Sequence, residues 1–326
     1  MPSALVSVVT PVYNAGKFLR ECVESVLAQS YGDFEHVILD NASTDDTRAI
    51  ADSYARRDPR IRVFSNERTL PLIENWNRSL ELISPDSRYC QTLHGDDRLY
   101  PECLARMAGL AGRHDGVGVV GSLRLRGEAI QCRGLPDDRQ VFDGAQVARL
   151  FLREEVFALA PTSGMVRSDI VRARRPYYPA RYLHADLAVY FAILDRTGFG
   201  FVHEVLAFSR THADSITSTL TERKRTLLRD WLMILQEFGG RYFTPDELAE
   251  LERRFLRRYY RMLVRETLLG AGRDFRVYHL EGLRRAGRAP GVADIVRALA
   301  AEGAAVSARP RRAFTRLREM LHRSRS

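Results

Sequence analysis

Four short apolar runs, each stopped by polar residues, constrain how the first hundred residues fold more than any other feature. The runs are rich in the β-branched and aromatic residues that favour strands, and helical patterns lie between them. They cover residues 5–12, 34–39, 61–64 and 89–93. Strands that alternate with helices run parallel and are joined by right-handed crossovers. The sequence therefore predicts a doubly wound α/β sheet, mostly parallel and flanked by helices.

Polar side chains gather where three of these strands end. They are Tyr13 and Asn14 after the first strand, Asp40 and Asn41 after the second, and Asp96 and Asp97 after the fourth. In an open α/β sheet, ligands bind beyond the carboxyl ends of the strands. An Asp-Asp pair in a single loop is more often turn chemistry or a helix cap. Three such loops together favour a nucleotide, with a divalent cation bridging its diphosphate.

The motifs of two other nucleotide-binding classes are absent from the sequence. No G-x-G-x-x-G follows the first strand, and no G-x-x-x-x-G-K-[ST] occurs anywhere. The four cysteines lie far apart with no C-x-x-C spacing, which argues against a zinc site and against a disulfide framework. A dinucleotide-binding enzyme and a P-loop NTPase are therefore disfavoured.

Four segments of the first 105 residues carry a recognisable set of motifs. They read VSVVTPVYN, ILDNASTDDT, NWNRSL and HGDDRLYPECL. This set resembles the nucleotide-binding half of family 2 glycosyltransferases, which have the GT-A fold. In that family the second segment usually carries two adjacent acids and a glycine before the serine, where this chain has Asp40, Asn41 and Ala42. Asn41 can accept a hydrogen bond from a base but also offers a donor, which leaves the identity of the base open.

The resemblance implies metal-dependent, inverting transfer of a sugar from a nucleotide-diphosphate donor, with a UDP-sugar as the expected donor. It implies that Asp97, assisted by Asp96, positions Mg²⁺ or Mn²⁺ on the donor diphosphate. The expected donor-binding residues are Pro11, Tyr13, Asn14, Asp40, Asn41, Asn77, Asp96 and Asp97. The residue pattern alone also predicts that Asn14 is the N-cap of the first helix.

The candidate general base is Asp186, in the segment YLHADLAVYFAIL at 182–194. A helix that begins near Asp186 buries Leu187, Tyr190, Phe191 and Leu194, and leaves the carboxylate at the positive end of the helix dipole. Taken alone, Asp186 would more often be a helix cap. In the family that this chain resembles, an Asp at the start of this helix, often preceded by Glu, is the general base. Here Ala185 holds the preceding position.

Three later segments complete the expected first domain. Residues 151–159 are predicted to be helical, and residues 161–167 are similar to the segment that lines the acceptor site in the family. Residues 203–217 resemble the run that ends the catalytic domain in the family. This resemblance implies that His212 can approach the metal or the diphosphate. A lone histidine is more often structural.

The chain is expected to divide into a GT-A catalytic domain at 1–218 and a basic α-helical region at 219–326. The first domain would comprise a donor-binding half, 1–110, and an acceptor-binding half, 111–218. From residue 221 onward there are 24 basic and 13 acidic residues, a net charge of +11, whereas the rest of the chain carries −2. Thr244, with Pro and then Glu in the first turn, predicts a helix from there to about residue 269.

The composition, 45% hydrophobic and 28% charged, is that of a globular protein. No run of about 18 apolar residues occurs, and the N-terminus leads directly into a strand, so a cytoplasmic protein is expected. The last 24 residues, basic and amphipathic, can lie peripherally on the inner face of an anionic membrane, or can be a solvated tail.

The expected acceptor is a glycan or a lipid-linked hydroxyl. The sugar, the linkage and the oligomeric state stay open. Two other functions also stay open: a nucleotide-sugar-binding subunit without catalysis and, on the basic tail alone, a nucleic-acid-binding protein.

Overall fold

The chain forms two compact units in a computed structural model that describes residues 4–212 and 224–302. The N-terminal unit spans Met1–His212, and the C-terminal unit spans Ala213–Ser326. Each unit has its own secondary structure: a sheet with helices in the first, and helices in the described part of the second.

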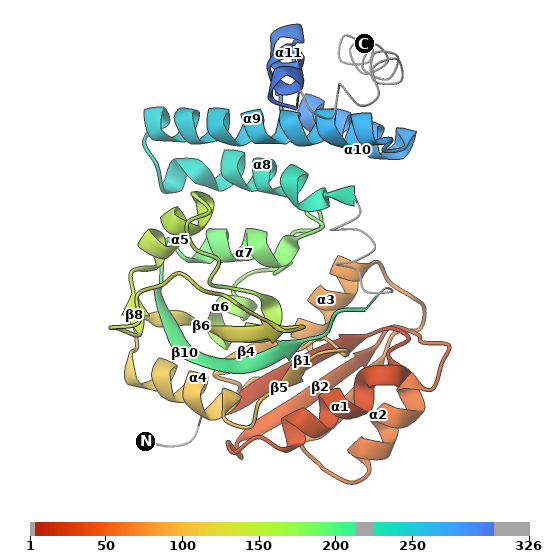
Figure 1. The fold of residues 1–326 in the computed structure, drawn as a ribbon. Coiled ribbons are helices and arrows are strands. Elements are labelled where there is room, and N and C mark those ends of the chain that lie inside the picture. The colour runs from red at the N-terminus through yellow and green to blue at the C-terminus, as the bar shows by residue number, and fades with distance from the viewer. Residues whose placement is uncertain (1–3, 213–223, 303–326) are drawn as a thin grey trace. The chain divides into compact units, whose positions relative to one another are not determined.

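The first half of the N-terminal unit is the predicted parallel sheet. Its strands lie in the order β3-β2-β1-β4, all parallel, with helices α1, α2 and α3 in the crossovers (Figure 1). The bounds are β1 Val6–Val12, α1 Gly16–Leu27, β2 Phe34–Asp40, α2 Thr47–Ala55, β3 Ile61–Ser65, α3 Leu72–Glu81 and β4 Tyr89–Thr92. All seven residues of β1 and of β2 are buried, as expected for strands that are covered on both faces.

The second half extends this sheet beyond β4, beginning with one antiparallel strand. Strand β9 runs antiparallel to both β4 and β6, and β10 then runs parallel to β6. The strands of this half are β5 Arg98–Leu99, β6 Val117–Arg126, β7 Ala129–Gln131, β8 Val141–Phe142, β9 Gly164–Arg167 and β10 Gly198–Ser209. The sheet is mixed but mostly parallel and flanked by helices, which confirms the predicted fold class.

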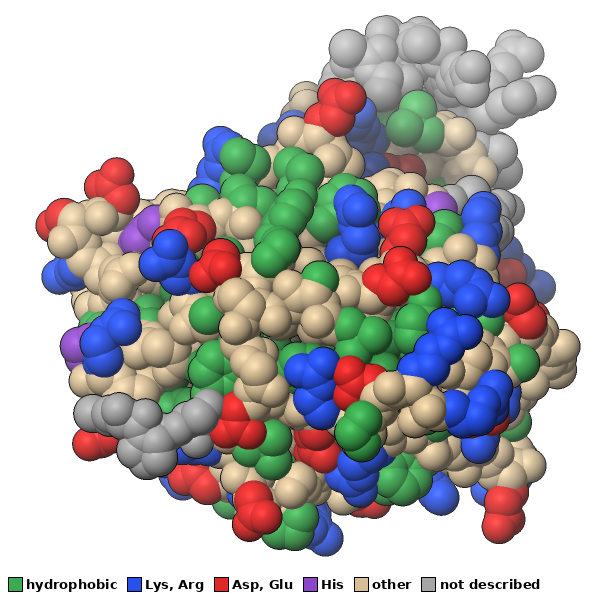
Figure 2. Space-filling model, turned by 90° about the horizontal axis from the view of Figure 1, so that it is seen from below, with side chains coloured by type: hydrophobic (Ala, Val, Ile, Leu, Met, Phe, Trp, Pro, Cys, Tyr) green, Lys and Arg blue, Asp and Glu red, His purple; other side chains and the backbone are tan. Residues whose placement is uncertain are grey.

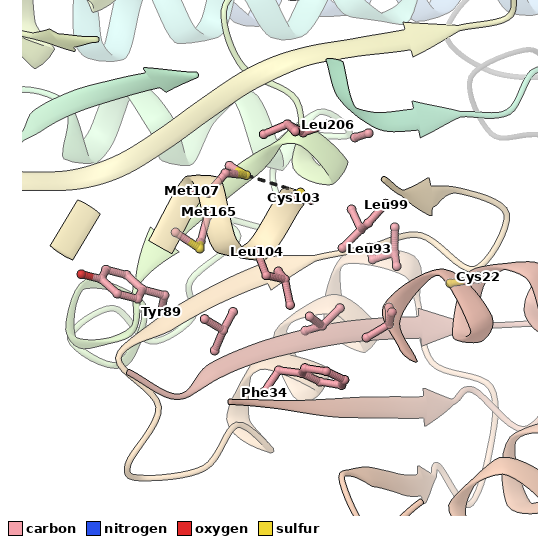
Figure 3. Packing of buried hydrophobic residues seen from close by; sticks show 14 of the residues in the cluster. Cys22, Phe34, Tyr89, Leu93, Leu99, Cys103, Leu104, Met107, Met165 and Leu206 are labelled. Carbon is pink, nitrogen blue, oxygen red and sulfur yellow. Dashed lines mark hydrogen bonds between the residues drawn. The ribbon is translucent and has the colours of Figure 1, made fainter. Parts of the chain in front are cut away.

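A large hydrophobic core joins the two halves. Helices α1, α2 and α4 (Cys103–Arg113) bury their apolar faces on the strands. Figure 3 shows Leu104 and Met107 of α4 among the labelled core residues, with Tyr89 of β4 and Phe34 of β2 nearby. Burial of such side chains stabilises the fold by roughly 1.5–3 kcal/mol each. This core fixes the strand ends on which the candidate site depends.

The helix predicted at residues 151–159 was placed too late in the chain. The observed helix, α5, spans Gly144–Leu152, and the carboxylate of Asp143 caps it by accepting a hydrogen bond from the Gln146 amide at 2.7 Å. Of the apolar residues after it, Val156, Ala158 and Leu159 are buried without forming a helix, so their hydrophobicity was not a helix signal. The remaining short elements are η1 Pro161–Ser163, α6 Ser168–Arg172 and α7 Ala185–Ile193.

The described part of the C-terminal unit is helical. Its elements are α8 Thr226–Phe238, η3 Gly239–Arg241, α9 Pro245–Leu269, α10 Arg273–Arg285 and α11 Val292–Ala301. The helix predicted from Thr244 is confirmed: Thr244 and Glu247 form a reciprocal capping box, and Gly270 ends the helix with φ of 102°. Among the described helices, none is both long and apolar enough to cross a membrane. The predicted amphipathic tail, 303–326, lies outside the described residues.

Candidate active site

The ends of β1, β2 and β4 lie at one edge of the sheet, as the sequence predicted. In the parallel register, Val12 is level with Asp40, and Val9 is level with Thr92. The polar residues that follow these strands therefore leave the sheet side by side. Gly95 allows this close approach, because a Cβ there would lie 2.7 Å from a methyl carbon of Val12.

The first two loops are tied together by Asn14. Its backbone amide donates to Ser43 Oγ at 2.9 Å, and its side-chain oxygen accepts from the Thr44 amide at 2.8 Å. The prediction that Asn14 caps the first helix is wrong, since Ala15 is the N-cap and has no capping side chain. Asn14 takes φ of 48°, a left-handed conformation that asparagine tolerates better than most residues. Beside it, half of the Tyr13 surface is exposed (50%), so this ring is available to a ligand.

Asp40 and Asn41 are both buried at the end of β2. Asp40 accepts hydrogen bonds from the Ser43 amide at 3.2 Å and from Ser65 Oγ at 3.4 Å. Asn41 holds the backbone of Leu70 at both ends: its Nδ2 donates to the Leu70 carbonyl at 3.0 Å, and its Oδ1 accepts from the Leu70 amide at 2.9 Å. Asn66 Nδ2 donates to the same Oδ1 at 2.7 Å. The Asn41 amide therefore shapes the loop at 66–70.

Asp97 is buried, and both of its carboxylate oxygens are occupied. Oδ2 accepts from Thr162 Oγ1 and from Ser209 Oγ, and Oδ1 accepts from the Arg210 amide. Burial raises the pKa of this carboxyl, although nearby His94 and the donated hydrogen bonds favour the charged form. The side chain thus joins the loop after β4 to η1 and to the end of β10.

Asp96 points to a different environment from its neighbour. Its Oδ2 lies 3.0 Å from Nε2 of His212, and its side chain is 28% exposed. Arg210 supports this corner by donating from Nε to the Asp96 carbonyl at 3.1 Å and from Nη2 to Glu21 at 2.7 Å. The ring of Phe18, in α1, lies under both Arg210 and His212. This geometry favours Asp96, with His212, over Asp97 as the carboxylate that faces a cation.

Two side chains of the described residues, Asp96 and His212, could serve as donors to a cation at this corner. Within 4–212 and 224–302, no group of three or more His, Cys, Asp or Glu side chains could hold a metal ion. Mg²⁺ is usually bound through one or two carboxylates, with substrate phosphates and water at the remaining positions. An oxygen of Asp96 and a nitrogen of His212, 3.0 Å apart, therefore fit a cation that is shared with a diphosphate.

Asp186 lies in the first turn of α7, as predicted. Leu187, Tyr190 and Phe191 of the same helix are buried. The N-cap is His184, so Asp186 is not the capping residue. In the described part of the chain, no hydrogen bond or ion pair engages the Asp186 carboxylate. It is close enough that its charge, added to the larger effect of burial, raises the pKa of both Tyr178 and Tyr190.

Tyr178, whose pKa responds to the charge of Asp186, contacts the end of β4. Its hydroxyl lies 3.3 Å from Thr92 Oγ1, and its ring packs edge-on against Trp76 at 5.6 Å between centroids. Trp76 in turn packs against His94, the residue two before Asp96. Asn77 fixes Tyr178 by pairing with both its amide and its carbonyl, at 2.7 and 2.8 Å. The side chain of Asn77 therefore positions this aromatic wall.

A comparison with protein-family models identifies the family of the chain. The model described as "Glycosyl transferase family 2" matches residues 7–174. The chain belongs to this family.

Known members and solved structures agree with that assignment. This family 2 chain is 34% identical over 130 residues to the putative glycosyltransferase EpsE of Bacillus subtilis, covering 40% of this chain and 46% of EpsE. The chain thus spans less than half of EpsE. Its fold is similar to that of Staphylococcus aureus TarS 1–349 in complex with UDP-GlcNAc, with a TM-score of 0.66, 16% identity, and coverage of 87% and 81%. It is also similar to the mannosyltransferase PcManGT of Pyrobaculum calidifontis in complex with GDP-Man and Mn²⁺ (0.56, 15%, 98% and 85%).

Three residues of this family 2 site were not found from the sequence. They are Trp76, His94 and Tyr178, whose rings pack in series to form an aromatic wall. Trp76 and His94 lie inside the segments that carried the resemblance, but aromatic rings in such segments are usually core residues. Tyr178 lies outside those segments, and only the fold brings it to β4.

Proposed function

We propose that the chain is a metal-dependent, inverting glycosyltransferase that moves a sugar from a nucleotide-diphosphate donor to a hydroxyl of a glycan or lipid-linked acceptor. Donor binding is assigned to residues 1–110 and acceptor binding to 111–218. Support comes from family membership and from the aromatic wall of His94, Trp76 and Tyr178: His94 lies two residues before Asp96, and the pKa of Tyr178 responds to the charge of Asp186.

The donor end of the site is the corner formed by Asp96 and His212. These two side chains would hold Mg²⁺ or Mn²⁺ against the diphosphate, which the cation neutralises as the nucleotide leaves. Asp97 keeps the loop in place from beneath through Thr162, Ser209 and Arg210. Asp40 and the exposed ring of Tyr13 are assigned to the nucleoside. Because TarS has a similar fold and binds UDP-GlcNAc, UDP-sugars are the first donors to test.

The acceptor end is Asp186, which would act as the general base. Its carboxylate would take the proton of the acceptor hydroxyl while the oxygen attacks the anomeric carbon from the face opposite the leaving group. One displacement of this kind inverts the anomeric configuration. The observation that carries the assignment is the Asp186 carboxylate in the first turn of α7, which no described residue engages and whose charge acts on Tyr178 at the end of β4.

A panel of nucleotide sugars tests the proposal. The full chain is incubated with each donor, with and without Mn²⁺, and released nucleotide is measured. Release from one donor class that requires the cation is the expected result. Donor binding without any release, with a range of acceptors, would instead identify a nucleotide-sugar-binding subunit without catalysis.

The face shown in Figure 2 carries acidic side chains among the basic ones, and so lacks the concentration of basic side chains that a nucleic-acid surface has. For the basic C-terminal unit, the proposal retains peripheral contact with an anionic membrane. Sedimentation with anionic vesicles, compared with neutral vesicles, tests that contact.

A further inference from the structure

A pocket lies between the end of α3 and the segment that follows α6, and it is bordered by Asn77, which also holds the Tyr178 backbone. Its volume is about 290 Å³. One wall carries Asn77 and Glu81 of α3, and the other carries Arg172, Arg174, Arg175 and Tyr177. This volume is near the lower limit of small-molecule sites, which are roughly 300–1,000 Å³. A small polar group with part of the molecule that carries it would fill the pocket.

The lining of this pocket is positively charged. Three arginines face one carboxylate, that of Glu81. Arg172 is held in place, since its Nη2 donates to the carbonyls of Ser84, Pro85 and Ser87 at 2.7–2.9 Å. Arg174 and Arg175 form no side-chain hydrogen bond or ion pair with any described residue. Two guanidinium groups are thus available for a ligand.

Arg174 carries the more specific signal of the two. Its Nε is buried and has no hydrogen-bond acceptor among the described residues. The planar guanidinium matches the geometry of a phosphate group, to which it can donate two parallel hydrogen bonds. An anion in the pocket would take these bonds from the terminal Nη atoms, because the buried Nε is closed to it.

The pocket adjoins the acceptor end of the site. Tyr177 lines it, and the hydroxyl of the next residue, Tyr178, lies 3.3 Å from Thr92 Oγ1 of β4. The charge of Asp186 contributes to the raised pKa of Tyr178. Asn77 borders the pocket and also holds the Tyr178 backbone. The donor diphosphate is assigned to a different corner, at Asp96 and His212. We therefore assign this pocket to the acceptor.

We propose that the α3–α6 pocket binds a phosphate ester of the acceptor through Arg174 and Arg175, with the attacking hydroxyl near Asp186. This inference rests on the proposed function, which it deepens by naming the acceptor class: a hydroxyl compound that carries phosphate. The phosphate can belong to a soluble polyol ester or to a lipid headgroup, and the experiment distinguishes these sources.

The test measures binding of glycerol 3-phosphate to the full chain by calorimetry, with UDP and Mn²⁺ present in excess to fill the donor site. Saturable binding is expected, with little or none for glycerol. Arg174→Gln should weaken binding at least tenfold, and Arg175→Gln should weaken it in the same direction. Arg113→Gln, an exposed arginine at the end of α4, is the matched control and should bind as the wild type does.

A parallel arm uses vesicles that contain phosphatidylglycerol. One possible result is that the wild type binds the vesicles but not the soluble ester, and that Arg174→Gln abolishes the vesicle binding. The phosphate is then carried by a lipid, and the pocket assignment stands. Equal binding of the wild type and Arg174→Gln in both arms would overturn it. UDP affinity is measured first on every variant, so that a folding defect in one is recognised. Absence of UDP binding in the wild type would count against the proposed function and not against the pocket.

Discussion

Two asparagine side chains near the site bind backbone. Asn41 pairs with the amide and the carbonyl of Leu70, and Asn77 pairs with the same groups of Tyr178. Each contact needs one donor and one acceptor on the same side chain, which an amide has and a carboxylate lacks. This explains in physical terms why an amide suits position 41 in this chain, where the resemblance led us to expect an acid.

Asn41→Asp tests this explanation. The carboxylate would lose the hydrogen bond to the Leu70 carbonyl and would place an oxygen against it in a buried position. We expect the free energy of unfolding at pH 7 to fall by about 2 kcal/mol, measured by urea denaturation. Asn77→Asp should behave in the same way. An Asn41→Asp protein as stable as the wild type would show that the two hydrogen bonds of Asn41 to the Leu70 backbone contribute little to stability.

His36 makes the stability of the sheet depend on pH. The ring is fully buried in β2, with Nε2 2.9 Å from Thr10 Oγ1, and burial lowers its pKa from 6.5 to about 3. Below pH 6.5 His36 binds a proton in the unfolded chain but not in the folded chain. The free energy of unfolding therefore decreases as the pH is lowered from 6.5 to about 3. At about 1.4 kcal/mol per pH unit, the loss between pH 6.5 and 5 is about 2 kcal/mol.

His36→Gln removes this titration. When the pH is lowered from 6.5 to 5, the free energy of unfolding of His36→Gln should fall by about 2 kcal/mol less than that of the wild type. Urea titrations at each pH measure this difference. His114→Gln, at an exposed histidine after α4, should follow the wild type. Identical slopes for His36→Gln and the wild type would mean that His36 is protonated in the folded state.

At the scale of elements, the parallel strands could be predicted because their signal is local. Each is a short apolar run, and the predicted ends of β2 and β3 are within one residue of the observed ones. The antiparallel strand β9 could not be predicted, because it depends on pairings such as Gln91 with Met165, far apart in sequence. The same limit applies to the site. Asp96 and Asp97 are adjacent, and only the fold turns one to His212 and the other to Thr162.

The capping of α9 is another local signal, and Thr244→Ala tests its strength. The Thr244 hydroxyl accepts from the Glu247 amide, and the Glu247 carboxylate accepts from the Thr244 amide at 3.0 Å. Loss of the cap should lower the unfolding free energy by about 1 kcal/mol, followed by helical circular dichroism. Thr244→Asp keeps a capping oxygen and should restore most of that loss. If Thr244→Ala leaves the free energy of unfolding unchanged, packing alone holds the start of α9.

At the scale of the whole molecule, protein, nucleotide and cation are expected to form one complex. Because the described residues offer the cation two donors, Asp96 and His212, we expect the nucleotide to provide others. We expect Mn²⁺ to bind at least tenfold more tightly in the presence of UDP, and by linkage UDP to bind more tightly with Mn²⁺. Electron paramagnetic resonance of free Mn²⁺ measures this. Equal Mn²⁺ affinity with and without UDP would contradict the shared site.

The most direct test of the proposed mechanism compares donor binding and turnover in Asp186→Asn, measured on the same preparation. We predict donor affinity within about twofold of the wild type and cation-dependent nucleotide release at least about 100-fold slower, since a positioned base contributes roughly 10²–10⁴-fold. Asp138→Asn, at an exposed aspartate, serves as the control and should retain full activity. Wild-type turnover by Asp186→Asn would contradict the assignment of Asp186 as the base.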